Sequence, residues 1–287
     1  MDAWLSWLIC GRSRKSSYAL LAPAVLWLAL FLIIPVACLL ELGFLRLGPY
    51  GTVVFSLTLS NFSRAIEPRY LEILLRTLGY AGITTLLCLA LGFPAAYYLS
   101  FRAGRRRELC LAALMIPFWT SCLVALYSWM IILGREGLLN SLLLRSGLIA
   151  HPLRLLNTPF SVVLGLAYFY IPFMVLPLYG SLEKLPRQYL EASYDLGAGR
   201  ARTFFKVTLP LCLPGVVAGC ILTFIPCMGD FLTAEFLGGP RTYLVGNLIQ
   251  NQFLMAQDWP FGAALTSVLL ILLVAGLYFY QRVEPQR

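Results

Sequence analysis

Charged side chains are scarce in this 287-residue sequence, because only 12% of its residues are Asp, Glu, Lys or Arg while 60% are hydrophobic. Soluble domains contain about 25% charged residues. A chain this apolar cannot cover a globular surface in water, so the composition excludes a soluble protein. The few charges are also unevenly placed, and six stretches of 23 to 28 residues contain none.

Several chemical signatures are missing as well. The sequence has no G-x-x-x-x-G-K-[ST] P-loop, no G-x-S-x-G and no H-E-x-x-H, so it offers no motif for nucleotide binding, serine hydrolysis or zinc proteolysis. Its eight cysteines form no C-x-x-C pair and His151 is its only histidine, which gives no metal-ligand spacing. We therefore expect no catalytic residue, cofactor or metal in this chain.

Each uncharged stretch is long enough to cross a bilayer as a helix, which needs about 20 apolar residues. The stretches are apolar on every face, unlike the alternating strands of a transmembrane β-barrel. We predict an all-α polytopic membrane protein with six transmembrane helices in a single domain over residues 1–287. The predicted spans are about 18–40, 77–101, 109–133, 158–182, 209–235 and 259–281.

Three other features of the chain complete the division into spans. The first uncharged run, 16–40, exceeds the 7–15 apolar residues typical of a signal peptide, so we expect it to remain as a membrane anchor. Residues 47–63 are rich in Gly, Ser and Thr and predict an extramembrane loop with a short strand. Residues 242–257 contain five amide side chains and predict an amphipathic helix at the membrane surface.

Basic residues are shared unequally between the two sides of these spans. The segments 1–15, 102–108, 183–206 and 282–287 carry 14 Lys and Arg residues, whereas the opposite loops carry eight. Because loops rich in Lys and Arg stay in the cytoplasm, we predict that both termini are cytoplasmic. The basic residues are divided among four segments rather than gathered on one face, so the net charge of +9 does not indicate nucleic-acid binding.

The longest of the predicted cytoplasmic segments is 183–206. Residues 187–196 predict a short amphipathic helix that begins after Pro186 and stops at Gly197, a residue suited to the position after a helix end. Such a helix could rest on lipid headgroups or offer one side to a partner protein, and the pattern alone does not separate the two.

Part of this segment resembles a known motif. The pattern Glu191-Ala192-Ser193-x-x-x-Gly197, followed by nine residues and then Val207-x-Leu209-Pro210, is similar to the EAA loop of ABC importer permeases, with Ser193 in place of Ala and Val207 in place of Ile. The resemblance implies that the loop docks in a groove of a cytoplasmic ATPase. The residues it implies for ATPase coupling are Glu191, Ala192, Asp195, Gly197, Leu209 and Pro210.

Further blocks resemble a narrower family, the first permease subunit of spermidine/putrescine importers. These blocks are 117–120, 171–179, 236–240 and 258–264. The resemblance implies a type I ABC importer permease fold and a multi-pass position in the bacterial inner membrane. It also implies a second six-span permease, two copies of an ATPase that bind ATP and Mg, and a periplasmic polyamine-binding protein as partners. Related importers share this scaffold, so another small solute remains an alternative.

A secondary transporter driven by an ion gradient is a third hypothesis. Such transporters place ionisable residues within their spans and contain two related halves. The six stretches here are free of charge, and residues 1–140 show no repeat in 141–287. The sequence therefore favours an ATP-driven importer subunit.

A polyamine would need carboxylates and aromatic faces along its path, because both stabilise ammonium groups. Asp230 and Glu235 flank the predicted extracytoplasmic end of span five, and their spacing places them partly on one side of a helix. Aromatic surface comes from Trp119, Tyr127, Trp129, Tyr168 and Tyr170. The alternative is that the aromatic residues form the belt found at membrane interfaces.

Overall fold

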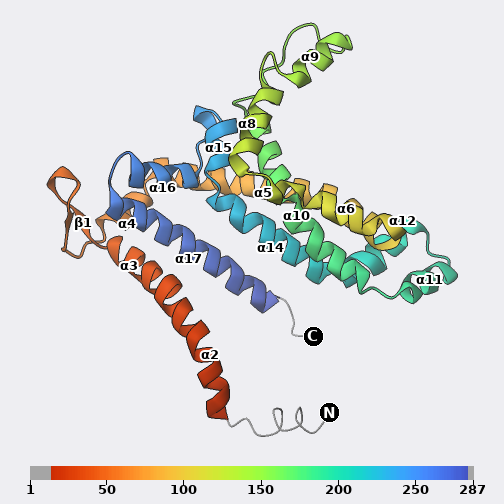
Figure 1. Cartoon of the computed structure of the whole chain (residues 1–287), viewed down its shortest axis with the longest axis horizontal. Coiled ribbons are helices and arrows are strands. Elements are labelled where there is room, and N and C mark those ends of the chain that lie inside the picture. Colours follow the sequence, from red (N-terminus) through yellow and green to blue (C-terminus); the bar gives the residue numbers. More distant parts are fainter. Residues whose placement is uncertain (1–13, 284–287) are drawn as a thin grey trace, which may run out of the picture. The chain divides into compact units, whose positions relative to one another are not determined.

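The computed structural model describes residues 14–283, so the predicted cytoplasmic segment before residue 14 and the last four residues lie outside the described part (Figure 1). The chain forms two compact units. Unit 1 combines the residues up to Glu67 with those from Gln252 onward, and unit 2 comprises Pro68–Asn251.

Unit 2 is built on three long helices that pack pairwise against one another, as Figure 1 shows. They are α5 (Pro68–Phe101), α10 (Pro159–Glu183) and α14 (Leu213–Gly229). Small residues let their backbones approach closely, as is usual in membranes. A Cβ added to Gly92 of α5 would lie 3.1 Å from Met174 of α10, and one added to Gly219 of α14 would lie 2.8 Å from the same side chain.

Two of the predicted spans are not continuous helices. The range 109–133 contains α6 (Arg107–Leu114), α7 (Ile116–Trp119) and α8 (Cys122–Leu133), with extended backbone at Thr120 and Ser121. The range 209–235 contains the end of α14 at Gly229, extended backbone at Asp230, and then α15 (Leu232–Leu237). Both breaks occur where residues that favour caps and turns follow an apolar helix.

The segment between α10 and α14 is strongly bent. It contains α11 (Arg187–Asp195), α12 (Arg200–Thr203), the π-helical turn η4 (Phe204–Thr208) and α13 (Leu209–Leu211). The arm Arg200–Leu211 meets α14 at an angle of 68°. Pro210 and Pro214 flank the bend, and each removes one backbone donor from the helical ladder.

The remaining elements from residue 102 to residue 254 are short. They are η3 (Gly104–Arg106), α9 (Leu138–Arg145), η5 (Pro240–Thr242) and α16 (Val245–Leu254). The helix predicted within 242–257 is thus present, but two of its amide side chains, Asn247 and Gln252, are buried in the protein rather than presented on a surface. Val245 is held by a hydrogen bond from its N–H to Thr77 of α5, 2.9 Å away.

Unit 1 contains the N-terminal helices and the last helix. Its elements are α2 (Arg14–Leu28), the π-helical η1 (Ala29–Ile33), α3 (Ile34–Leu42), β1 (Arg46–Leu47), η2 (Pro49–Gly51), β2 (Val53–Val54), α4 (Ser60–Ala65) and α17 (Trp259–Val283). The strands β1 and β2 pair antiparallel, which confirms the short strand predicted within 47–63. Helices α3 and α4 both pack on α17.

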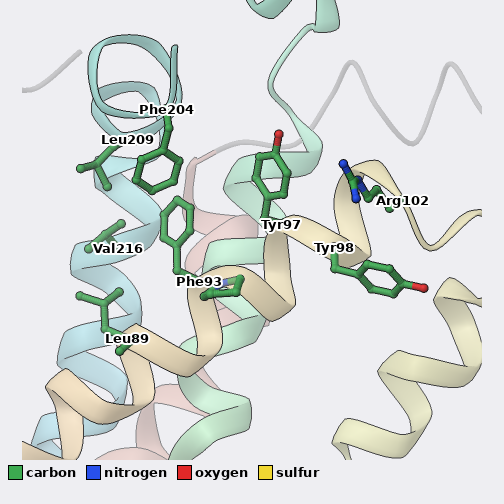
Figure 2. Close-up of a pocket in the computed structure, with 10 residues that line it drawn as sticks. Leu89, Phe93, Tyr97, Tyr98, Arg102, Phe204, Leu209 and Val216 are labelled. Atoms are coloured by element: carbon green, nitrogen blue, oxygen red, sulfur yellow. The ribbon is translucent and has the colours of Figure 1, made fainter. Parts of the chain in front are cut away.

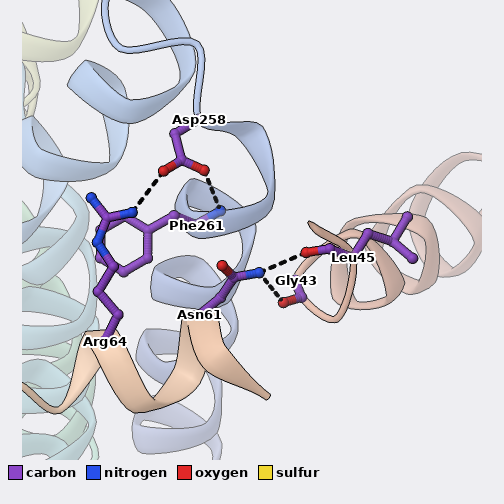
Figure 3. Close-up of polar contacts among 6 residues, drawn as sticks. All are labelled: Gly43, Leu45, Asn61, Arg64, Asp258 and Phe261. Atoms are coloured by element: carbon purple, nitrogen blue, oxygen red, sulfur yellow. Dashed lines mark hydrogen bonds and ion pairs between the residues drawn. The ribbon is translucent and has the colours of Figure 1, made fainter. Parts of the chain in front are cut away.

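Polar contacts fix the joint between α3, α4 and α17 (Figure 3). The amide of Asn61 donates to the carbonyls of Gly43 at 2.9 Å and Leu45 at 2.8 Å. The guanidinium of Arg64 pairs with Asp258 at 2.7 Å, and the same carboxylate accepts the N–H of Phe261 at the start of α17. An ion pair and a helix cap therefore stabilise unit 1 in addition to its apolar packing.

Within the described residues, five helices are long and apolar enough to cross a membrane, or six if the bent pair counts as one span. The five are Leu21–Leu42 (part of α2 with η1 and α3), Pro68–Phe101 (α5), Cys122–Arg145 (α8 taken together with α9), Pro159–Glu183 (α10) and Trp259–Tyr278 (part of α17). The bent pair is Arg200–Leu211 with Leu213–Gly229. The protein is thus an all-α membrane protein.

Candidate functional site

Helix α11 begins after Pro186, as the sequence predicts, and ends at Asp195, one residue before the predicted end, with Leu196 as its cap and Gly197 next. Gly197 has a φ of +77°, a conformation that costs an L residue about 1–2 kcal/mol. The N–H of Gly197 bonds the carbonyl of Tyr194, and the N–H of Ala198 bonds that of Ser193. This pair of bonds is the Schellman ending of a helix, and it turns the chain toward α12.

One face of α11 has no partner within unit 2. Leu190 is its only buried residue, whereas Glu191, Ala192 and Asp195 are exposed and Leu196, just after the helix, is 88% exposed. The structure therefore groups three of the predicted coupling residues on one short helix. Leu209 and Pro210 lie instead at the start of α13, beside the bend.

The role of Ser193 is visible only in the structure. Its hydroxyl lies 3.0 Å from the hydroxyl of Thr203, which is 2% exposed, so the two side chains form a hydrogen bond between α11 and α12. Ser193 stands where the EAA pattern has a second Ala, and this bond is a contact that Ala could not make. The sequence shows that Ser replaces Ala at this position, but it does not indicate that Thr203 is the hydrogen-bond partner.

Asp230 lies at the break between α14 and α15. Its carboxylate accepts hydrogen bonds from the phenol of Tyr170 at 3.0 Å, from the N–H of Thr233 at 2.8 Å and from the hydroxyl of Thr233 at 2.9 Å. The bond from the N–H of Thr233 caps the start of α15. The expectation that Asp230 and Glu235 share one side of a continuous helix is wrong, because the backbone at Asp230 is extended.

Glu235 is exposed and has a different set of neighbours. Its carboxylate accepts a hydrogen bond from the amide of Asn247 at 3.1 Å, and that amide also donates to the carbonyl of Phe231 at 2.9 Å. Burial raises the pKa of the Tyr243 phenol, and the negative charge of Glu235 raises it further. Asn247 is thus a site residue that sequence reasoning placed only in a surface helix.

The aromatic candidates separate into distinct contacts. The ring of Trp129 packs edge-on against Tyr168 with centroids 5.6 Å apart, and Tyr127 packs against Phe236 at 5.2 Å. Trp119, at the end of α7, is 80% exposed. Of the five aromatic candidates, only Tyr170 is hydrogen-bonded to one of the two candidate acids.

Comparisons with known proteins bear on the whole chain. Residues 88–287 match the family model described as binding-protein-dependent transport system inner membrane component. The spermidine/putrescine transport system permease protein PotB of Haemophilus influenzae is 40% identical over 256 residues, covering 89% of this chain and 90% of that protein. The protein of the same name in Escherichia coli is 43% identical over 256 residues, covering 89% and 93%.

A solved structure has the same fold. It is that of a bacterial alginate ABC transporter in complex with an alginate pentasaccharide-bound periplasmic protein, and it matches with a TM-score of 0.71 at 17% identity over 99% of this chain and 98% of the other. The fold is thus that of an ABC importer permease. With the family match and the two relatives, this places the chain among the binding-protein-dependent transport system inner membrane components, the family to which it belongs.

Proposed function

We propose that this chain is the first of two permease subunits in an ATP-driven importer that moves spermidine or putrescine from the periplasm to the cytoplasm. The observation that carries the proposal is the identity of 40% and 43% to two permeases named for these polyamines, over about nine-tenths of every chain compared. An importer for another small solute remains the second candidate, because related systems share the scaffold.

The proposed assembly pairs this chain with a second six-span permease, two copies of a cytoplasmic ATPase that bind ATP and Mg, and a periplasmic polyamine-binding protein. Both termini and helix α11 face the cytoplasm in this proposal. Helix α11 then docks on the ATPase through its uncovered face. The exposed carboxylates of Glu191 and Asp195 pair there with basic groups of the ATPase, and the exposed side chain of Leu196 adds apolar contact.

The remaining proposed coupling residues act through the backbone. Gly197 sets the turn after α11. The small side chain of Ala192 lets the ATPase approach the exposed face of α11 closely. Leu209 and Pro210 lie where the arm meets the bend, so a movement of α11 reaches α14 through them. Closure of the ATPase dimer would thereby bias the spans between inward-open and outward-open arrangements.

Asp230 and Glu235 form the proposed cation path together with Tyr170. A carboxylate binds an ammonium group through charge-assisted hydrogen bonds, and an aromatic face adds a cation–π contact. Trp119 and Tyr127 are exposed, whereas Trp129 and Tyr168 are partly buried, so all four retain surface that a solute could contact.

The test is uptake by a bacterial strain that lacks its own polyamine importers and expresses the complete four-component system. Labelled spermidine and putrescine should accumulate only with ATP, and purification of this chain should bring down the ATPase and the second permease. Uptake of another solute without uptake of spermidine or putrescine would show that the polyamines are not the substrate. Uptake that persists without the ATPase would reject the importer class in favour of a secondary transporter.

A further inference from the structure

A groove on the surface of unit 2 runs between α5 and the bent segment that leads into α14. It encloses about 690 Å³, and its lining includes Leu89, Phe93, Tyr97, Arg102, Phe204 and Val216. A second hollow of about 860 Å³ shares Tyr97, Arg102 and Phe204 with it and extends to Arg200. The two hollows therefore adjoin, and we call them together the α5–α14 groove.

The two ends of the groove differ in chemistry. Figure 2 shows Leu89, Phe93, Phe204 and Val216 gathered at one end, whereas the phenol oxygen of Tyr97 and the guanidinium of Arg102 lie away from them. The rings of Phe93 and Phe204 meet edge-on with centroids 5.1 Å apart and form the apolar floor. The groove thus has an apolar trough and a cationic, hydroxyl-bearing mouth.

Positive charge dominates this mouth. Arg102 and Arg200 line the two hollows, and no acidic residue is among the lining residues. Arg107 is paired with Glu183. Among the described residues, the guanidiniums of Arg102 and Arg200 take part in no ion pair and no hydrogen bond. Two uncompensated cations beside an apolar trough fit an anionic amphiphile.

We propose that the α5–α14 groove binds an anionic phospholipid. The phosphate lies at the mouth between Arg102 and Arg200, with the Tyr97 hydroxyl as an additional donor, and one acyl chain follows Leu89, Phe93 and Val216. An acyl chain in the trough would bury its own apolar surface and that of the lining side chains, and the phosphate would form charge-assisted hydrogen bonds with the two guanidinium groups. Basic pockets between transmembrane helices bind acidic headgroups in this way. A helix of another subunit is the alternative occupant, and the cross-linking measurement below separates it from lipid.

The test measures lipid retained by the complete transporter. The complex is reconstituted in nanodiscs containing phosphatidylglycerol and phosphatidylethanolamine with identical acyl chains, and lipids that remain after extraction are counted by native mass spectrometry. We expect selective retention of phosphatidylglycerol. Arg102→Gln should reduce it about fivefold, and the double variant with Arg200→Gln about thirtyfold, because each basic residue contributes comparably to binding acidic lipid.

Two controls keep the result specific. Arg145→Gln changes an exposed arginine on α9, far along the chain from the groove, and should leave retention unchanged. A photo-reactive benzoyl-phenylalanine at Ala90, which lines the groove, should cross-link to phosphatidylglycerol in preference to phosphatidylethanolamine. The same group at Leu91, which is exposed on α5 but does not line the groove, should show no such preference. The variants at Arg102 and Arg200 alter exposed side chains, so assembly of the complex should persist.

Three outcomes would overturn the proposal. They are equal retention of the two lipids, retention of phosphatidylglycerol that survives the double substitution, and a cross-link from Ala90 to the second permease instead of lipid. None of these measurements uses transport. The lipid site therefore stands or falls independently of the solute that the importer carries.

Discussion

The phenol of Tyr170 donates a hydrogen bond to the carboxylate of Asp230 over 3.0 Å, across 60 residues of sequence. The bond joins α10 to the break between α14 and α15. Because Thr233 donates twice to the same carboxylate, Asp230 both caps a helix and holds two segments together. Any effect of this acid on transport must therefore be separated from its effect on the fold.

A double-mutant cycle makes that separation. Tyr170→Phe and Asp230→Asn should show a coupling energy of about 1.5–3 kcal/mol in unfolding of the purified complex, since a hydrogen bond to a charged group contributes about this much. Tyr168→Phe is the matched control, because Tyr168 contacts Trp129 through its ring. If Asp230 also lines the path, Asp230→Asn should raise the polyamine concentration for half-maximal uptake while Tyr170→Phe leaves it nearly unchanged. A coupling energy near zero would show that the hydrogen bond contributes nothing.

Glu235 offers a cleaner test of the cation path, because its side chain is exposed. Among residues 14–283 it accepts one hydrogen bond from a side chain, that of Asn247. Glu235→Gln keeps an acceptor for that bond, so assembly should be normal while the apparent affinity for spermidine falls by about tenfold, the loss expected for one charge-assisted contact. Uptake kinetics in whole cells give the measurement. Unchanged kinetics for both Glu235→Gln and Asp230→Asn would move the path to the second permease.

Gly197 should matter through its backbone conformation. A Cβ at this position would meet no atom within 4 Å, so Gly197→Ala should cost about 1 kcal/mol from the left-handed conformation alone. Gly199→Ala is the control, since that residue is equally open and has a φ of −69°. Gly197→Asn should retain most uptake because Asn tolerates this conformation. Asp tolerates it as well, but Gly197→Asp adds a negative charge at the proposed ATPase contact, so this variant should insert normally but lose ATPase association and uptake. Full uptake by Gly197→Asp would contradict the coupling role.

The pair formed by Arg64 and Asp258 should stabilise unit 1 more than an exposed pair stabilises a helix. Asp258→Ala removes both the ion pair and the cap on Phe261 and should cost about 2 kcal/mol of unfolding free energy, whereas Asp258→Asn keeps the cap and should cost less. Glu72→Gln, which breaks the exposed pair with Arg76 on α5, should cost at most about 0.5 kcal/mol. Denaturant unfolding of the purified complex compares the three, and equal losses would refute the distinction.

The orientation prediction can be checked by labelling single cysteines in a cysteine-free background. Residues 106 and 193 should be protected from an impermeant thiol reagent in intact cells, whereas residues 51, 146 and 241 should react. The reason is the excess of basic residues in the segments that contain 106 and 193. Reaction at residue 193 in intact cells would reverse the orientation and with it the proposed docking of α11.

The sequence was sufficient to predict the helices that are marked by local features, such as a long apolar run or a glycine after the helix end. Long apolar runs predicted α5, α10 and α17, and Gly197 predicted the end of α11. The breaks at Thr120 and at Asp230 were not predicted, because the long apolar runs before them outweighed the short signal of residues that favour caps and turns. The partner of Asp230 is a tyrosine 60 residues away, and Asn247 meets Glu235 only after α16 packs against this region. Such contacts depend on tertiary packing and have no local signature.

The bend at Cys212 joins two helical arms of unit 2, so that a rigid rotation of one arm would move the other like a cranked lever. The arm Arg200–Leu211 stands at 68° to α14. Close packing of Gly215 against Ser181 of α10 supplies a fulcrum, since a Cβ at Gly215 would overlap the serine hydroxyl oxygen. At 1.5 Å per residue the arm is about 18 Å long and α14 about 25 Å. From Gly215 the 14 residues to Gly229 span about 21 Å, close to the length of the arm. A rigid turn about Gly215 therefore carries a displacement of about 2 Å at Arg200 to Gly229 at about the same size but in a new direction, at the residue that precedes Asp230.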